Sequence, residues 1–194
     1  MADENAAYWI SDGQLYHRVG EESGFVITEV GPDSHLKLTP RYLLVITTHP
    51  TARDQASLLI IDRDTEEIDI RLRQDDLLNG LALYDADFRS STTLTLTLRL
   101  ESWPYFGRVC DLELSAGELR CFSDSPPQIN EIVWVNDHLF WSSKRAILKL
   151  FDHSDGSSYQ VASQWHNPRS LTKINDSLVW LDFHAGSFWR LIEE

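Results

Sequence analysis

Three groups of residues in this sequence carry side chains of the types that proteins use for chemistry. The first is the acidic run Asp62-Arg63-Asp64-Thr65-Glu66-Glu67, whose carboxylates alternate as they do at the start of a calcium loop. The run lacks the turn glycine and the closing glutamate of such a loop, so it favours a polar hairpin turn. The carboxylates that would attract a basic partner here are Asp62, Asp64, Glu66 and Glu67.

The second group, Asp152-His153-Ser154-Asp155, contains the residue types of a hydrolase triad. Adjacent residues in a turn cannot reach one another as a nucleophile, its base and an orienting acid must, so we predict no catalytic residue here. The third group is the seven histidines, none of which has a histidine at i+4 or a Cys-x-x-Cys companion. The sequence also lacks a glycine-rich phosphate loop. We therefore predict no metal site and no cofactor.

Aromatic residues are the better candidates for a binding surface. Five of the seven tryptophans lie between Trp134 and Trp189. Trp134, Trp141 and Trp180 belong to apolar runs, and we expect them in the core. Exposed Trp, Tyr and Arg side chains dominate many protein interfaces. The predicted contact residues, from one aromatic loop and from positions outside the apolar runs, are Trp103, Tyr105, Phe106, Trp165, His166, Arg169 and Trp189.

A repeat organises the second half of the chain. Asn136-Asp137-His138-Leu139-Phe140-Trp141 returns 39 residues later as Asn175-Asp176-Ser177-Leu178-Val179-Trp180. Each copy has an apolar run, an Asn-Asp corner and a second apolar run, which is typical of two antiparallel strands joined by a tight turn. The short connections that follow also require antiparallel neighbours, because a parallel crossover needs about a dozen residues or more. We therefore predict an antiparallel meander.

The first half contains weaker versions of the same unit. Asp12-Gly13 stands between two strand-like runs and predicts a hairpin. Residues 42–47 are apolar without alternation, which predicts a central strand covered on both faces. Residues 67–72 alternate charged and aliphatic side chains, which predicts an edge strand. Residues 94–100 alternate Leu with polar residues at a period of two and cannot form a helical stripe. Only residues 74–80 leave room for a helical turn.

The repeat resembles the Tyr-Trp-Thr-Asp blade of low-density-lipoprotein-receptor-type β-propellers. The residues that carry this resemblance are Phe140-Trp141-Ser142-Ser143, Asp155-Gly156-Ser157 and Val179-Trp180-Leu181-Asp182 with Phe188-Trp189-Arg190. The resemblance covers about two blades, within residues 129–190, and more faintly residues 8–20. In such blades the aromatic and aspartate positions are structural, so the resemblance implies packing and turn closure and no catalytic residue.

The expected fold is a single all-β repeat domain over residues 1–194, made of antiparallel meander repeats. A period near 40 residues leaves room for a small β-propeller of four to five blades, fewer than the six of the receptor family. The residues themselves do not separate this architecture from a two-sheet β-sandwich, which is the alternative.

Charge limits the possible partners. The chain has 194 residues, with 30 acidic and 17 basic side chains and a net charge of −13. Such a surface repels phosphate backbones and anionic lipids, so we expect neither nucleic acid nor membrane as a partner. A basic protein is the better candidate. The excess is concentrated in residues 1–87, which hold 17 acidic and 7 basic residues.

The N-terminal residues, the apolar segments and the cysteines bear on the cellular compartment. Residues 1–7 have neither a basic flank nor an apolar run, so no secretory or transit signal is predicted. No segment approaches the roughly 20 apolar residues of a membrane helix. The expected location is cytoplasmic. Cys110 and Cys121 flank a predicted hairpin and are expected to be buried thiols rather than a disulfide, as is usual in a reducing compartment.

These observations favour a non-catalytic, acidic protein-binding module, one form of which is an inhibitor or immunity protein for a basic toxin or enzyme. Two alternatives stay open. The first is a hydrolase or lyase with its site in a propeller channel, where loops of several blades would meet. The second is a scaffold subunit completed by dimerisation, that is, a homodimer, because the last repeat stops after three predicted strands.

Overall fold

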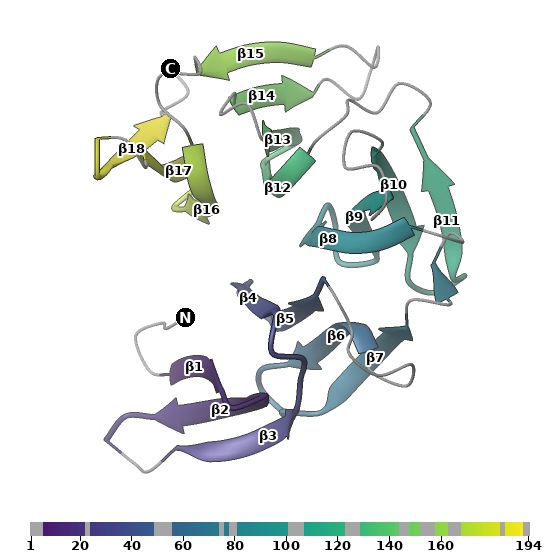
Figure 1. Cartoon of the computed structure of the whole chain (residues 1–194), viewed down its shortest axis with the longest axis vertical. Helices are drawn as coiled ribbons and strands as arrows, with labels where there is room; N and C mark the ends of the chain where they lie inside the picture. The colour runs from purple at the N-terminus through teal and green to yellow at the C-terminus, as the bar shows by residue number, and fades with distance from the viewer. Residues whose placement is uncertain are drawn as a thin grey trace. The chain divides into compact units, whose positions relative to one another are not determined.

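The computed structural model describes residues 6–21, 24–48, 56–73, 76–77, 81–100, 107–122, 129–143, 148–151, 158–162, 168–182 and 185–191 (Figure 1). Nearly all of these residues belong to β-strands or to the turns between them, and Asp76 makes a short 3₁₀ turn within the only stretch expected to allow one. In this part of the chain, no helix has the length and apolar character needed to span a bilayer.

The described strands form five small sheets. The first sheet contains β1 (Ala6–Ser11), β2 (Gln14–Val19) and β3 (Phe25–Glu29). The second contains β4 (Ser34–Leu38), β5 (Tyr42–Thr47), β6 (Ala56–Asp62) and β7 (Ile68–Arg73). The third is β8 (Leu81–Phe88), β9 (Thr93–Leu100), β10 (Gly107–Glu113) and β11 (Glu118–Cys121). The fourth is β12 (Ile129–Val135), β13 (His138–Ser143), β14 (Leu148–Phe151) and β15 (Ser158–Ala162), and the fifth is β16 (Pro168–Ile174), β17 (Ser177–Asp182) and β18 (Ser187–Leu191).

Strands within each sheet follow chain order, so every sheet is an antiparallel meander. This confirms the predicted all-β meander. The alternative of a two-sheet sandwich is wrong, because short connections keep each group of three or four strands as a separate sheet in the described part of the chain.

The chain divides into two compact units, residues 1–83 and residues 84–194, with the division inside β8. The first unit contains the sheets β1–β3 and β4–β7. The second contains the strands from β9 onward and the larger part of β8. A single domain over the whole chain stays a prediction.

In the first unit, hydrophobic patterning places each strand as the sequence indicates. β5 and β6 lie in the middle of their sheet and are buried nearly throughout, whereas β7 alternates half-buried and exposed residues at the edge. Both predictions, a central strand at 42–47 and an edge strand near 67–72, are confirmed. The facing sheets share an apolar core formed by Tyr8, Leu15, Val30, Leu43, Val45, Ala56, Leu59 and Ile61.

In the second unit, the repeated tryptophans are core residues, as predicted. Trp134 and Trp141 pack in one apolar cluster, and Trp180 packs in the next, against Val133 and Phe140. The Asn-Asp pair at the start of the second repeat forms the tight turn that the sequence predicts. Asn175 and Asp176 have φ of 47° and 57°, which is the left-handed conformation that a two-residue turn needs to match the twist of its strands.

Carboxylates join the sheets of the second unit, and two of them, Asp85 and Asp87, are buried. Oδ2 of Asp85 accepts a hydrogen bond from the backbone N–H of Ile132 at 2.7 Å, and Oδ2 of Asp87 accepts one from Trp134 at 2.7 Å. Glu131 accepts the N–H of Leu171 in the next sheet at 2.8 Å. β12 and β16 are edge strands. The carboxylates therefore satisfy donors on these edges that buried backbone must not leave unpaired.

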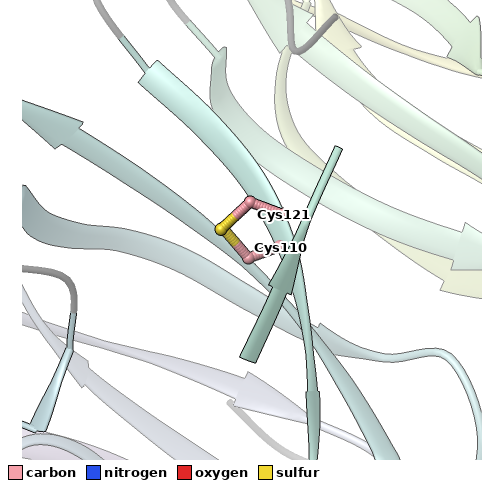
Figure 2. Close-up of a disulfide and its surroundings, with 2 residues drawn as sticks. All are labelled: Cys110 and Cys121. Carbon is pink, nitrogen blue, oxygen red and sulfur yellow. A yellow bond between two sulfur atoms is a disulfide. The ribbon is translucent and has the colours of Figure 1, made fainter. Parts of the chain in front are cut away.

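Cys110 and Cys121 form a disulfide (Figure 2). The expectation of buried thiols is wrong, because the antiparallel register of β10 and β11 places the two residues directly opposite, with their Cα atoms 3.9 Å apart. A disulfide is typical of an oxidising compartment. The cytoplasmic location stays a prediction that this bridge does not favour.

Candidate functional site

The predicted contact residues fall into two classes. Trp103, Tyr105, Phe106, Trp165 and His166 lie outside the described residues. Arg169 lies in β16 opposite Leu181, but its side chain is outside what the structure describes. Trp189 is 44% exposed on the edge strand β18, and its part in a contact stays a prediction.

Asp62 is buried and closes the turn between β6 and β7. Its Oδ1 accepts the backbone N–H groups of Asp64 at 2.9 Å and Thr65 at 3.3 Å, and its Oδ2 accepts Nε of Arg41 at 3.0 Å. The hydrogen bond from the Asp64 backbone, followed by the one from Arg41, lowers the pKa of Asp62. The run is thus the polar hairpin turn that its sequence favours. Only Asp64 and Glu67 are exposed for a partner.

Glu66 is also used inside the molecule. Its carboxylate pairs with Nδ1 of the buried His17 on β2. The His17 ring stacks on Tyr8 with centroids 4.4 Å apart. Burial, followed by the charges of Glu66 and Asp64, raises the pKa of Tyr8. Glu66 therefore links the two sheets of the first unit rather than offering a free charge.

The outer face of β1–β3 carries an aromatic surface that the sequence alone did not indicate. Trp9, Tyr16 and Val26 lie in register across the three strands and define what we call the aromatic row. Trp9 and Tyr16 stack with centroids 5.4 Å apart. Trp9 is 38% exposed and Val26 is 45% exposed. The opposite face of β1–β3 contributes to the core, so the row is the face left to solvent within this unit.

Gly24 gives Trp9 its position. A Cβ atom at this glycine would lie 2.4 Å from Cη2 of the indole, so any larger residue would displace the ring. The indole is thus held against both Tyr16 and the backbone beside β3. The available sequence signal was the alternation in β1, which puts Trp9 on the face opposite Tyr8 and Ile10.

A pocket of about 730 Å³ opens between the two sheets of the first unit. Three of its lining residues, Thr47 of β5 and Ala56 and Leu59 of β6, are buried, and we call them its floor. The loop end of β3 and the β1–β2 turn form the other wall. This volume lies within the range of about 300–1,000 Å³ typical of small-molecule sites.

Charged residues surround the mouth of this pocket. Asp12 comes from the β1–β2 turn, Glu29 from β3 and Arg71 from β7, and all three are exposed. The side chains of Glu29 and Arg71 make no hydrogen bond or ion pair with the part of the chain that the structure describes. These charges are therefore available to a ligand.

The pocket and the aromatic row adjoin each other. The Tyr16 hydroxyl donates to Oε1 of Gln14 at 3.0 Å, and Gln14 lies opposite Glu29 in the register of β2 and β3. Gln14 and Glu29 both line the pocket. Apolar and acidic groups thus form one continuous surface. Among the residues covered by the structure, no cluster of three or more His, Cys, Asp or Glu side chains is arranged to hold a metal ion.

Neither a protein-family model nor a curated protein matches the sequence. Solved structures do match. A chain of the nidogen/laminin complex has a TM-score of 0.68 and 12% identity, covering 97% of this chain and 72% of that chain. An oligogalacturonate lyase in complex with manganese has a TM-score of 0.60 and 14% identity, covering 91% and 52%. An auxiliary nutrient binding protein from Bacteroides ovatus has a TM-score of 0.62 and 13% identity, covering 95% and 51%.

This chain therefore spans about half the length of the lyase and of the nutrient binding protein. At such low identity the similarity establishes the fold alone. The small antiparallel sheets are those of β-propeller blades, which confirms the fold expected from the resemblance to receptor-type repeats.

Proposed function

We propose that this protein is a non-catalytic binding module that contacts a basic partner protein through the aromatic row and the carboxylates beside it. The observation that carries the proposal is the stacked Trp9–Tyr16 pair, exposed on a sheet face and bordered by side chains with unpaired charge. Fixed aromatic side chains offer contact area at little entropic cost, which is why they dominate many interfaces.

Charge supports the choice of partner. The net charge of the chain is −13, and Asp12 and Glu29 add local negative charge at the edge of the row. Acidic surfaces accelerate encounter with basic proteins and repel acidic ones. Arg18 is the exposed base on the same face of β2 and would favour one orientation of the partner over another. An inhibitor or immunity protein for a basic toxin or enzyme is one specific form of this proposal.

The test is affinity capture from the native host with the full chain, followed by mass identification and measurement of partner affinity. The double variant Trp9→Ser/Tyr16→Ser removes both aromatic side chains of the row. We expect at least a tenfold loss of affinity, because truncated aromatic hot spots cost about 2 kcal/mol or more. The matched control is Phe188→Ser, which removes an aromatic side chain that is 77% exposed in the other unit. It should leave affinity unchanged.

Two results would contradict the proposal. The first is a partner whose affinity is the same for the double variant and for the wild-type chain. The second is a large loss of folding stability in the double variant, since that would make the row an internal packing face. Affinity that does not fall between low and high salt would remove the electrostatic part of the argument.

A further inference from the structure

We propose that the pocket of the first unit binds a basic α-amino acid, lysine or arginine. This inference goes beyond the proposed protein contact, because it concerns the cavity between the sheets and not the exposed row, although both use the carboxylates of Asp12 and Glu29. The ligand chemistry follows from the charges at the mouth, from the apolar floor and from the fixed geometry of the surrounding turn.

The charges at the mouth match this ligand in number and sign. Asp12 and Glu29 provide two carboxylates, and Arg71 provides one guanidinium. A free basic amino acid carries two cationic groups and one carboxylate, which is the complementary set. Arginine side chains bind carboxylates in a planar, two-point geometry, so Arg71 is the group that would recognise the α-carboxylate.

The floor suits an aliphatic stem. Ala56 and Leu59 are buried beneath the mouth, with Val30 on the opposite wall. Lysine and arginine bury their methylene chains on apolar surface while their charged ends stay hydrated or paired. The polar floor residue Thr47 already shares a hydrogen bond with Ser34 at 2.6 Å, so the floor needs no polar ligand group.

The backbone fixes the acidic side of the mouth. Asp12 and Gly13 have φ of 50° and 73°, which is the conformation of a tight two-residue turn. The N–H of Val30 donates to the carbonyl of Gly13 at 2.8 Å and joins this turn to the end of β3. Asp12 and Glu29 are therefore held on one side. On the other side, Arg71 lies opposite Leu59 in the register of β6 and β7, so its side chain starts directly beside the floor.

A peptide that ends in lysine or arginine presents the same side-chain cation and the same carboxylate as the free amino acid, but an amide in place of the α-ammonium. Titration calorimetry of the full chain with four small probes separates these sources. L-lysine presents the whole set of charges, and Nα-acetyl-L-lysine imitates a peptide end. L-lysinamide lacks the carboxylate, and L-norleucine lacks the side-chain ammonium. We expect lysine to bind about tenfold more tightly than lysinamide or norleucine, since each loses one charged hydrogen-bonded contact.

The acetylated probe decides between the two sources. Binding equal to that of lysine identifies a peptide end, and weaker binding identifies the free amino acid, whose second ammonium uses the second carboxylate. Weaker binding supports the proposal, whereas equal binding would overturn the match of two carboxylates to two cationic groups on which it rests. No heat of binding for lysine or arginine at about 10 mM would overturn it, as would equal affinity for lysine and lysinamide.

Variants assign the groups. Arg71→Gln should reduce lysine affinity about tenfold and abolish the preference for lysine over lysinamide, while Glu29→Gln should reduce lysine affinity and keep that preference. Arg73→Gln is the matched control, because Arg73 is exposed on the same face of β7 and does not line the pocket. An Arg73→Gln effect as large as that of Arg71→Gln would show nonspecific charge attraction and overturn the assignment.

Discussion

The two compact units join their sheets by different means. In the first unit the sheets share an apolar core around Leu15, with the pair of His17 and Glu66 at its border. In the second unit, carboxylates reach from one sheet to the edge strand of the next, at Asp85, Asp87 and Glu131. Apolar contact has no preferred direction, whereas a hydrogen bond between buried groups specifies which residues face each other.

This difference explains where the pocket lies. The two-residue spacing of Asp85 and Asp87 matches that of Ile132 and Trp134, so each carboxylate fixes one donor and the register is set. Trp134 adds a hydrogen bond from Nε1 to the Thr95 hydroxyl at 2.9 Å. The contact between the sheets of the first unit is mainly apolar, with the pair of His17 and Glu66 at its border. It tolerates an opening of about 730 Å³ at one end, where charged side chains can receive a ligand.

Leu15→Ala should have the largest effect of the four changes considered. Leu15 is fully buried in the apolar core between the sheets of the first unit, and truncating a buried leucine costs about 3 to 4 kcal/mol of unfolding free energy. Urea unfolding gives the total effect, and hydrogen exchange locates it. We expect faster exchange in β1–β7 and little change in β12–β18. Equal acceleration of exchange in both units would contradict the view that the sheets of each unit are held together independently.

Reduction of the disulfide should come next. The bridge closes a short loop, with a sequence separation of 11 between Cys110 and Cys121. Loops of this size contribute about 2 to 3 kcal/mol by restricting the unfolded chain. Added reductant should therefore lower the urea midpoint and accelerate exchange in β8–β11. The Cys110→Ala/Cys121→Ala variant should be insensitive to reductant, and a midpoint shift in that variant would refute this attribution.

Asp85→Ala tests the hydrogen bonds that join the sheets of the second unit. It leaves the buried N–H of Ile132 without its acceptor, at a cost of about 2 kcal/mol. Asp85→Asn keeps an oxygen acceptor and should lose less than the alanine variant. Hydrogen exchange should accelerate at β12. An alanine variant as stable as wild type would mean that removal of a buried charge offsets the lost hydrogen bond. The carboxylates would then fix the register of the two sheets without adding to the free energy of unfolding.

Tyr8→Phe should have the smallest effect, visible only at alkaline pH. The raised pKa of Tyr8 means that the folded protein holds the phenol proton above the pH at which the unfolded chain releases it. This contribution is complete below about pH 10, the ordinary value for tyrosine, and is lost as the pH rises through the folded pKa. The stability difference between wild type and Tyr8→Phe should therefore fall above pH 10 in urea titrations. A constant difference from pH 8 to 11 would contradict it.

Much of the fold follows from local sequence. Alternation of residue types identifies β7 and β9, although β9 is buried on both faces, unbroken apolar runs identify β5 and β6, and Asn175-Asp176 predicts its own turn. These features depend on neighbours within a few positions, where side-chain period and turn conformation act directly. The candidate surface was harder to predict. In the sequence, Trp9 does not differ from the other aromatic residues of predicted strands. Only the pairing of three strands places Tyr16 and Val26 beside it.

By itself the sequence determined an all-β chain of short antiparallel meanders with tryptophans in its core, and an acidic surface. Tertiary structure decided which charges remain available. Asp62, Glu66 and Asp85 are all carboxylates in polar or alternating stretches, yet each is taken up by a contact inside the molecule. Asp85 and Ile132 are 47 residues apart in the chain. A hydrogen bond over that separation depends on how two sheets pack, and no local pattern encodes such a distance.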